Sequence, residues 1–426
     1  MRKFLLYLGA VVFLAVPIAA WVAAMAPLFG QLPFSYLALQ VAAFVAFTLF
    51  FFQFVLSSRI RVFEKDIGLD RLFVAHRLVG MVGLGFAVAH LVLVGIYELG
   101  FLGRLSLSFG KVLGAVALIG FIVVGVVASA YKVLNLRYET WKNIHRAAYV
   151  LYPVLFAHIL LLGSTLSASP WAAGYVYVII GLYVLIVIAK SIKIIRVRRH
   201  PLTVAAVDQV THDTWNVTFE GPKPEFKAGQ FMLVALRRNG TTSESHPYTI
   251  SASPGSDTLS ITAKNIGDFS ASIKDTKPGD TAFIEAPYGA FTLDRAPTEK
   301  IAFIAGGIGI TPFMSMLREM RDTGTHRPVT LLWGNKTERD IAFRDELEEL
   351  QRTISDFQMI HVMSSQDDWP GEKGFITEDK ITRLIPDYAE RSFYICGPPV
   401  MREKVVPMLQ SLGLGRSRIF YEIFAL

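Results

Sequence analysis

Residues 72–97 read LFVAHRLVGMVGLGFAVAHLVLVGIY, and residues 144–163 read IHRAAYVLYPVLFAHILLLG. Both stretches are apolar and reach the length of roughly 20 residues that a helix needs to cross the hydrocarbon of a bilayer. Other stretches of this kind occur at residues 4–28, 36–57, 111–131 and 171–192. The first part of the chain therefore predicts a bundle of six membrane-spanning helices.

Histidines lie within or at the ends of both quoted stretches, and a membrane-embedded ionisable side chain usually marks a functional site. His76 and His90 are 14 residues apart, which in a helix is about 21 Å along the axis and about 40° around it. His145 and His158 are 13 residues apart, about 20 Å along the axis but about 140° around it. The fifth span must therefore depart from ideal geometry, and Pro153 offers a kink or local unwinding.

The third and fifth spans cross the membrane in the same direction, so His76 faces His145 at one level and His90 faces His158 at the other. Two facing imidazoles at each level are typical of bis-histidine haem sites. A single membrane histidine is more often a polar contact between helices. Zinc or copper is a weaker alternative, because no Cys, Asp or Glu completes a ligand shell. We therefore predict that these four histidines bind two b-type haems.

The charge distribution predicts the orientation. The 426 residues are 52% hydrophobic, with a net charge of +7 and a mean hydropathy of +0.43. Basic residues gather after the second, fourth and sixth spans, whereas the alternate loops hold only Arg104 and Lys111. This bias predicts a multi-pass protein of the cell membrane, embedded in lipid, with both termini and the soluble half in the cytoplasm. The basic excess is thus a topology signal, and no nucleic-acid partner is expected.

Residues 199–297 predict a small antiparallel β-barrel. Runs rich in β-formers, separated by Gly, Pro and Asp, occur at 204–207, 214–219, 230–236, 259–262 and 281–285. Residues 246–251, HPYTIS, place a ring and hydroxyls where they can stack on a flavin and bond its edge; the candidates are His246, Pro247, Tyr248, Thr249 and Ser251. Residues 264–270, KNIGDFS, offer a close backbone approach and a helix N-terminus to a pyrophosphate; the candidates are Lys264, Gly267 and Ser270. Alone, each stretch is more often an ordinary strand or turn.

Residues 298–426 alternate strand and helix, which predicts an α/β nucleotide-binding domain. A buried strand at 300–305 leads into GGIGITP at 306–312 and then into a helix, an arrangement that binds a pyrophosphate. Candidates in this loop are Gly306, Gly307, Gly309, Thr311 and Pro312. Lys336 and Arg339 follow the next strand and suit the 2′-phosphate of NADPH, although a solvated loop is the simpler interpretation. A later strand ends in CGPP, which places Cys396, Gly397 and Pro398 at the ligand crevice of the sheet.

Together these features resemble the ferric reductase and NADPH oxidase superfamily over nearly the whole chain. The histidine spacings match the haem-ligand spacing of its six-helix domain, and the soluble half looks like the ferredoxin–NADP⁺ reductase fold. HPYT resembles the oxidase form of the flavin motif, with His246 where soluble reductases usually have arginine. GDFS at 267–270 resembles the segment that binds the FAD pyrophosphate. The 306–312 and 396–399 stretches resemble nicotinamide-nucleotide motifs.

The resemblance implies a multidomain membrane protein: a six-helix transmembrane haem domain at 1–198, a FAD-binding β-barrel at 199–297 and an α/β NAD(P)-binding domain at 298–426. Its implied cofactors are FAD, two b-type haems and NADPH or NADH, with hydride transfer near Cys396. The family often ends in an aromatic residue that covers the flavin. Here Phe424 is the candidate, but two residues follow it. Without a calcium-binding loop, the chain resembles the simplest bacterial members.

The terminal acceptor is open between alternatives that use the same residues. The short and nearly neutral outer loops favour O₂, giving superoxide, over an Fe(III) chelate. Electron delivery to a periplasmic protein is a third alternative, although these loops are short for a large docking surface. No obligatory protein partner is therefore expected.

Overall fold

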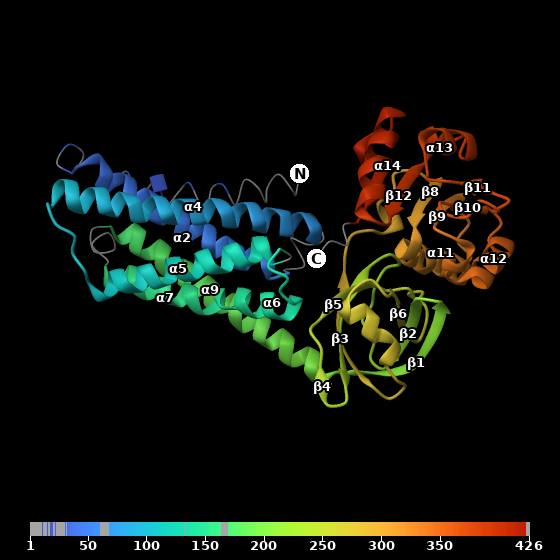
Figure 1. The fold of residues 1–426 in the computed structure, drawn as a ribbon, viewed down its shortest axis with the longest axis horizontal. Coiled ribbons are helices and arrows are strands. Elements are labelled where there is room, and N and C mark those ends of the chain that lie inside the picture. The colour runs from blue at the N-terminus through green and yellow to red at the C-terminus, as the bar shows by residue number, and fades with distance from the viewer. Residues whose placement is uncertain are drawn as a thin grey trace. The chain divides into compact units, whose positions relative to one another are not determined.

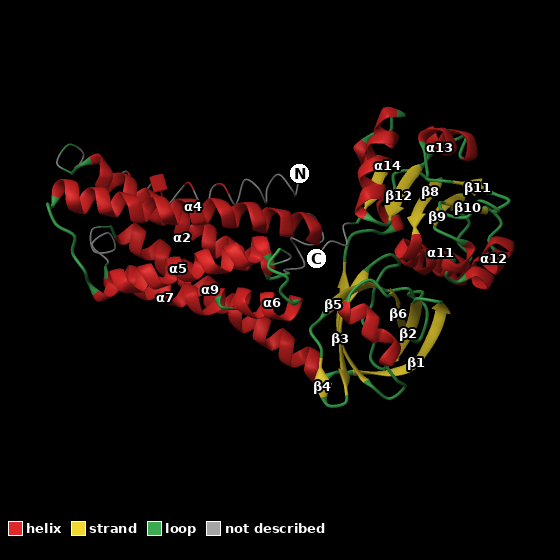
Figure 2. Ribbon diagram, viewed as in Figure 1, coloured by secondary structure: helices red, strands yellow, loops and turns green. Residues whose placement is uncertain are grey.

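The computed structural model describes residues 32–59, 68–131, 133–162 and 169–422, with a few isolated positions before residue 32. It divides into two compact units, Met1–Lys193 and Ile194–Leu426 (Figure 1). Helices make up the described part of the first unit, whereas the second contains all the described β-strands that pair into sheets (Figure 2). The predicted span at 4–28 lies almost wholly outside the described residues.

The first unit contains the helices of the predicted membrane domain. They are α2 (Phe34–Ser57), α4 (Leu69–Phe101), α5 (Phe109–Ala130), α6 (Tyr138–Arg146), α7 (Ala148–Leu161) and α9 (Pro170–Arg199). Five segments, counting α6 and α7 as one, are long and apolar enough to cross a membrane. They coincide with the predicted spans from 36–57 onward. α2 packs along α4 and α5 packs along α7, and a core of aromatic side chains from α2, α5, α7 and α9 lies between them.

The fifth span is interrupted at Ala147, between α6 and α7. The Ala147 amide donates to the carbonyl of Ile144 at 3.0 Å, a tighter turn than that of an α-helix. Pro153 lies inside α7 and has no N–H to offer the carbonyl of Tyr149, which instead accepts from the Tyr183 hydroxyl at 2.7 Å. The departure from ideal geometry that the histidine spacing requires thus lies six residues before the proline.

The second unit begins with an antiparallel sheet. Its strands are β1 (Leu202–Thr211), β2 (Thr214–Glu220), β3 (Phe231–Arg238), β4 (Thr241–Thr242), β5 (His246–Thr249), β6 (Leu259–Lys264) and β7 (Thr281–Tyr288). The order is β4-β3-β7-β1-β2-β6, with β5 paired to β3. A single bridge between Ile250 and Ile261 connects the end of β5 to β6. Each predicted run overlaps one of these strands, and closure into a full barrel stays a prediction.

A parallel sheet follows, built from β8 (Ile301–Gly306), β9 (Val329–Asn335), β10 (Phe357–Met363), β11 (Glu372–Lys373), β12 (Ser392–Cys396) and β13 (Ile419–Tyr421). Its order is β11-β10-β9-β8-β12-β13. α11 (Thr311–Thr323) and α12 (Arg344–Thr353) cover one face, and α13 (Glu378–Leu384) and α14 (Pro399–Ser411) cover the other (Figure 1). The chain runs from β8 to β9 and β10 on one side and then crosses to β12 on the other. The strand order therefore reverses between β8 and β12, where doubly wound sheets bind ligands.

Candidate functional site

The four predicted histidines meet in the two predicted pairs. The ring centres of His76 and His145 are 5.9 Å apart, and those of His90 and His158 are 6.5 Å apart. A metal–imidazole bond of about 2 Å, plus about 1 Å from the nitrogen to the ring centre, puts two axial imidazoles roughly 6 Å apart across one ion. The four side chains are half-buried. Each pair thus has the spacing of two ligands on one haem iron.

Hydrogen bonds fix the ring orientation in the His90–His158 pair. Nδ1 of His90 lies 2.9 Å from the carbonyl oxygen of Leu39, and Nδ1 of His158 lies 2.8 Å from that of Gly110. A carbonyl oxygen can only accept, so each Nδ1 carries the proton and each Nε2 presents its lone pair. Histidine ligands of metals usually have this arrangement. The donor chemistry of this pair therefore fits a metal bound between the two Nε2 atoms.

The His76–His145 pair has different neighbours. The side-chain amide of Gln53, on α2, lies 3.0 Å from Nδ1 of His76. Its oxygen accepts from the backbone amide of Gly80 at 3.0 Å, so its nitrogen is the atom that faces the His76 ring and donates to Nδ1. Nδ1 of His145 has no hydrogen-bond partner among the residues that the structure describes, and its ring stacks on Trp141 at 5.7 Å. The two levels are thus built differently around the same pair of ligands.

The two predicted flavin segments lie together in the second unit. The ring of His246, on β5, stacks on Phe269 of α10 (Asp268–Ala271) with centres 4.0 Å apart. Tyr248 lies on the same strand with its ring 6.1 Å from Phe269, and burial raises the pKa of its hydroxyl. Pro247 and Thr249 alternate with these rings and pair with β3. The segments 246–249 and 267–270 therefore form one aromatic surface suited to a flavin ring.

Ser251 is placed differently from the rest of the predicted flavin motif. Its side chain is fully buried, 2.9 Å from the Ser260 hydroxyl, and it accepts from Thr262 at 3.2 Å. These bonds join neighbouring strands inside the sheet. The Ser251 hydroxyl thus stabilises the sheet that carries the flavin motif and does not face outward.

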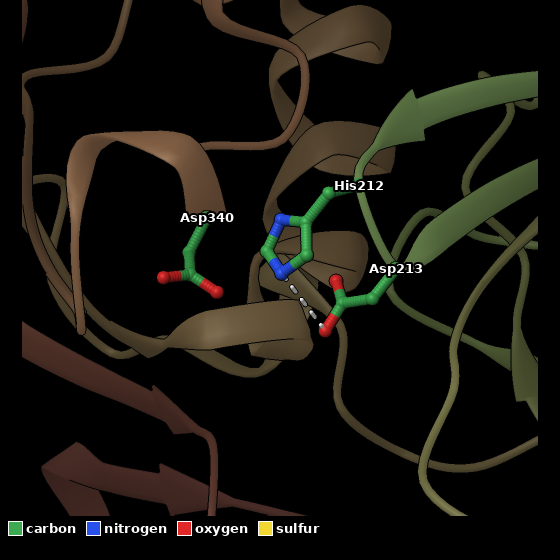
Figure 3. A group of neighbouring side chains, drawn as sticks. All are labelled: His212, Asp213 and Asp340. Atoms are coloured by element: carbon green, nitrogen blue, oxygen red, sulfur yellow. Dashed lines mark ion pairs between the residues drawn. The ribbon is translucent and has the colours of Figure 1, made fainter.

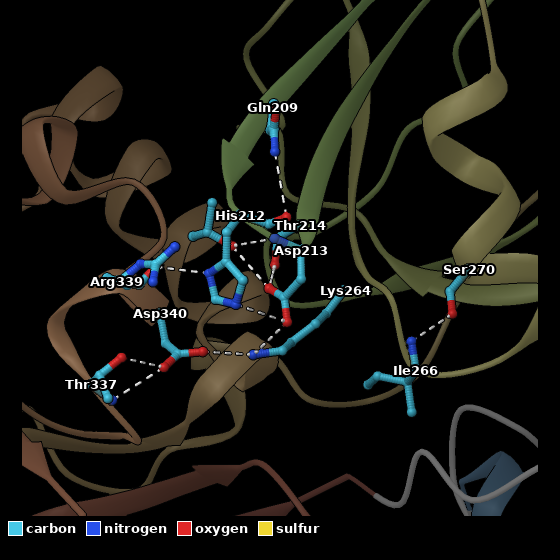
Figure 4. Close-up of polar contacts among 11 residues, drawn as sticks. Gln209, His212, Asp213, Thr214, Lys264, Ile266, Ser270, Thr337, Arg339 and Asp340 are labelled. Atoms are coloured by element: carbon cyan, nitrogen blue, oxygen red, sulfur yellow. Dashed lines mark hydrogen bonds and ion pairs between the residues drawn. The ribbon is translucent and has the colours of Figure 1, made fainter. Parts of the chain in front are cut away.

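The predicted pyrophosphate segment forms a tight turn. The Ser270 hydroxyl accepts from the backbone amide of Ile266 at 3.0 Å (Figure 4) and from that of Gly267 at 2.9 Å. A Cβ added to Gly267 would meet nothing within 4 Å, so the backbone is open there to a close approach. α10 has only four residues. The predicted helix N-terminus is therefore a single turn, and its own serine already satisfies two of the amides.

The glycine loop after β8 packs directly on the turn after β12. A Cβ on Gly309 would lie 2.2 Å from the carbonyl oxygen of Cys396, and one on Gly397 would lie 3.0 Å from the amide of Gly306. Gly307, by contrast, has a φ of 52° and open space around it. The two predicted nucleotide motifs thus meet at the point where the strand order reverses.

The helix after this loop begins as predicted. α11 starts at Thr311, with Pro312 in its first turn. Proline is favoured there because its missing N–H would have no partner in the helix. Pro398 directly precedes α14 and packs toward Gly306, since a Cβ on that glycine would lie 2.9 Å from the proline Cδ.

Cys396 is a buried thiol, with 3% of its surface exposed. Burial raises its pKa, and the carboxylate of Glu422 raises it further, so the group is uncharged at neutral pH. Glu422 also lies against Gly289, where an added Cβ would be 2.7 Å from its Oε1. The sequence analysis missed this acidic residue. Phe424 lies outside the described residues.

Lys336 and Arg339 line a cavity of about 500 Å³ in the second unit, together with the turn after β1, the loop after β6 and Ser365. Both side chains are exposed. Lys264 lies in the same cavity, where its ammonium is 3.3 Å from Asp213 and 3.1 Å from Asp340 (Figure 4). Partial burial lowers the pKa of Lys264, but the two carboxylates outweigh this effect and raise it. The charge of Lys264 is therefore neutralised by its ion pairs with these two aspartates.

His212, Asp213 and Asp340 have ligand atoms within 4.8 Å of one another (Figure 3). Nε2 of His212 lies 3.7 Å from Asp213, and its Nδ1 lies 3.4 Å from the carbonyl oxygen of Arg339. Because the Lys264 ammonium bridges both carboxylates, this cluster already has its cation. We interpret it as an ion-pair network that joins β1 and β6 to the loop after β9.

Three family models match the chain in sequence order. A ferric reductase-like transmembrane component matches residues 42–156, a FAD-binding domain matches 198–291, and an oxidoreductase NAD-binding domain matches 303–406. This order is the ferric reductase/NADPH oxidase-type architecture, and the chain belongs to that type. One chain thus carries a transmembrane component, a FAD-binding domain and an NAD-binding domain.

Relatives are found among reductase components. The glycine betaine monooxygenase reductase subunit of Chromohalobacter salexigens is 32% identical over 53% of this chain and 64% of its own length. The propane 2-monooxygenase reductase component of Rhodococcus jostii is 30% identical over 52% of this chain and 62% of its own. The chain thus spans less than two thirds of these relatives. A flavohemoglobin from Malassezia yamatoensis with bound FAD and heme shares the fold, with a TM-score of 0.52, 18% identity, and coverage of 97% of this chain and all of that one.

Proposed function

We propose that this protein is a transmembrane oxidoreductase of the cell membrane. It takes electrons from cytoplasmic NAD(P)H, passes them through FAD and two b-type haems, and reduces O₂ to superoxide on the outer side. The observation that carries this proposal is the pairing of four histidines at two levels, with ring centres 5.9 and 6.5 Å apart.

FAD, when bound, converts the hydride of NAD(P)H into single electrons, and the haems supply one-electron carriers between the two sides. One NAD(P)H thus reduces two O₂ molecules to superoxide, with NAD(P)⁺ and one proton as the other products. His90 and His158 would hold the haem at the outer level, and the protein would thus supply two imidazole ligands to its iron. With both ligands supplied by the protein, this haem would give single electrons to O₂ by outer-sphere transfer.

The residues around the nucleotide motifs support NADPH as the donor. Lys264 is neutralised by two aspartates, whereas Lys336 and Arg339 project into the same cavity with exposed side chains. Two cations at the end of β9 suit the 2′-phosphate that distinguishes NADPH from NADH. The buried thiol of Cys396 lines the hydride-transfer site as an uncharged group.

The outer loop between α4 and α5 supports a small neutral acceptor. Glu98 is 6% exposed and forms an ion pair with Lys111. It also accepts from the backbone amide and the hydroxyl of Ser106, at 3.2 and 2.8 Å. This pair leaves Arg104 as the uncompensated cation of the loop, so the surface attracts anionic Fe(III) chelates only weakly.

A second candidate is electron delivery to a protein partner. It is favoured by the relatives, which are reductase components of oxygenases. In that case electrons leave through a docked protein and not through O₂.

Two assays test these alternatives on the full chain in detergent. A pyridine haemochrome assay should find two b-type haems per flavin, and one haem or none contradicts the proposal. NADPH-driven reduction of cytochrome c should be abolished by superoxide dismutase. If dismutase has no effect while Fe(III)-citrate is reduced quickly, the protein is a ferric-chelate reductase. If neither acceptor is reduced, electron delivery to a partner becomes the better assignment.

A further inference from the structure

The carbonyl of Gly110 is a hydrogen-bond acceptor in the first turn of α5. Nδ1 of His158 lies 2.8 Å from it, across the contact between α5 and α7. In a helix this carbonyl normally accepts the amide of the residue four positions later, here Gly114. A carbonyl oxygen has a second lone pair, which the imidazole can use if nothing covers it.

Gly114 is the residue that leaves this carbonyl uncovered. Helical Cα–Cβ bonds tilt toward the N-terminus, so a side chain at position i+4 lies over the carbonyl of position i. A Cβ built on Gly114 would lie 2.5 Å from Nδ1 of His158 and 2.6 Å from its Cε1. Both distances are far below the contact distance of about 3.5 Å between non-bonded heavy atoms. The imidazole therefore occupies the space that any other residue at position 114 would fill.

The facing ligand is held in a similar way. Nδ1 of His90 lies 2.9 Å from the carbonyl of Leu39 on α2, and the residue four positions after Leu39 is the small Ala43. Helix backbones thus orient both rings of this pair.

We propose that Gly110 and Gly114 of α5 are positioning residues for His158: the Gly110 carbonyl fixes its tautomer and ring plane, and the absent side chain of Gly114 makes the space for the ring. The inference rests on the proposed haem ligation. A hydrogen bond from Nδ1 keeps Nε2 unprotonated and makes it a stronger donor to iron. A methyl at position 114 displaces the ring from this bond, and loss of such a partner typically lowers metal affinity by roughly 10- to 100-fold.

The test compares alanine variants along α5. Gly114→Ala introduces the clash with His158. Gly120→Ala introduces a clash at the same distance, 2.5 Å, but with the flexible end of Leu151 on the same contact between α5 and α7. Gly125→Ala is the neutral control, because its new Cβ would lie 3.4 Å from the nearest neighbour, Leu84. The full-length proteins in detergent are compared by haem-to-flavin ratio, redox titration and the ferric EPR signals.

We expect the Gly114→Ala variant to contain about one haem per flavin. If a second haem stays weakly bound, its EPR signal and its midpoint potential should differ from those of the wild type. The haem that remains should have the same EPR signal and midpoint potential as the haem that remains in His90→Leu, a variant without the ligand that faces His158. Gly120→Ala and Gly125→Ala should keep both haems with unaltered signals. The inference is overturned if Gly114→Ala keeps both signals unaltered, or if Gly120→Ala alters the same signal.

A second measurement needs no glycine variant. Because both Nδ1 atoms of the His90–His158 pair donate to carbonyls, its ligands should stabilise ferric iron more than those of the other pair. The haem that His90→Leu removes should therefore be the one of lower midpoint potential. Loss of the higher-potential component contradicts the inference. A wild-type protein without haem refutes the proposed function as well, so the two failures are distinguishable.

Discussion

Replacing Lys336 or Arg339 with alanine should weaken binding of NADPH without changing that of NADH. A hydrogen bond to a charged group contributes about 1.5–3 kcal/mol when well shielded. Both side chains are exposed at the cavity, so solvent screening reduces this to about 1–1.5 kcal/mol each. At 1.36 kcal/mol per tenfold, each substitution should raise the KM for NADPH about tenfold. The double variant should raise it about 50- to 100-fold, with some loss of additivity between close neighbours.

The assay is steady-state NADPH and NADH oxidation by the full-length protein, with flavin content as a check on folding. Raising the ionic strength should reduce the difference in the KM for NADPH between the wild type and the variants, because salt screens the contacts of the two cations with the phosphate. Arg352→Ala removes an exposed cation from the same domain but outside the cavity, and it should leave both KM values unchanged. Equal losses for NADH and NADPH, or an unchanged preference, would show that these two residues do not bind the 2′-phosphate.

Other predictions concern stability, potential and the thiol. Burial lowers the pKa of His361 to about 4, with a smaller contribution from a nearby arginine, whereas the unfolded chain binds its proton near 6.5. The free energy of unfolding should therefore fall by roughly 3 kcal/mol as the pH drops from 7 to 4. In urea titrations followed by flavin release, His361→Phe should remove this loss, and the surface variant His326→Phe should not. Gln53→Leu should shift the midpoint of only the haem bound by the His76–His145 pair in a redox titration; a shift of both components contradicts this. Cys396→Ala should leave the pH profile of flavin reduction unchanged from pH 6 to 9 in stopped-flow measurements, because the buried thiol does not ionise there. A lost ionisation would show that a thiolate takes part.

The histidine pairs could be predicted because helix geometry is nearly independent of sequence. A rise of about 1.5 Å and a turn of about 100° per residue place His76 and His90 on one face at two depths. The same numbers showed that the span with His145 and His158 must break. Where it breaks could not be predicted, because the tight turn at Ala147 depends on packing against other helices.

In the soluble unit the strands could be predicted from local pattern, but the partners of their side chains could not. Ser251 belongs to a flavin-like motif by sequence, yet pairing with β6 directs its hydroxyl to Ser260. Lys264 suited an anionic ligand, and two aspartates distant in sequence neutralise it. Both outcomes depend on contacts between segments that sequence pattern does not reveal.

The acceptors around the histidines were missed for a different reason. Every residue has a carbonyl, so nothing in the sequence singles out those of Leu39 and Gly110. The available signal was the spacing of Gly110 and Gly114, four residues apart on one helix face, which permits close helix contacts. Gln53 gave a second signal, as an amide within the apolar run 36–57.

Because of these acceptors, different kinds of substitution can alter the hydrogen bonding of the histidines in the two pairs. A side chain, Gln53, lies against the His76–His145 pair, so single substitutions there can alter the ligand's hydrogen bonding while the helices stay in place. At the His90–His158 pair the acceptors are backbone carbonyls, which no substitution removes. The hydrogen bonding of His90 and His158 therefore changes only when the helices pack differently, for example after a substitution at Gly114. In the proposed electron path, the helix framework therefore fixes the site that meets the acceptor. The potential of the His76–His145 site is then the one that side chains can adjust.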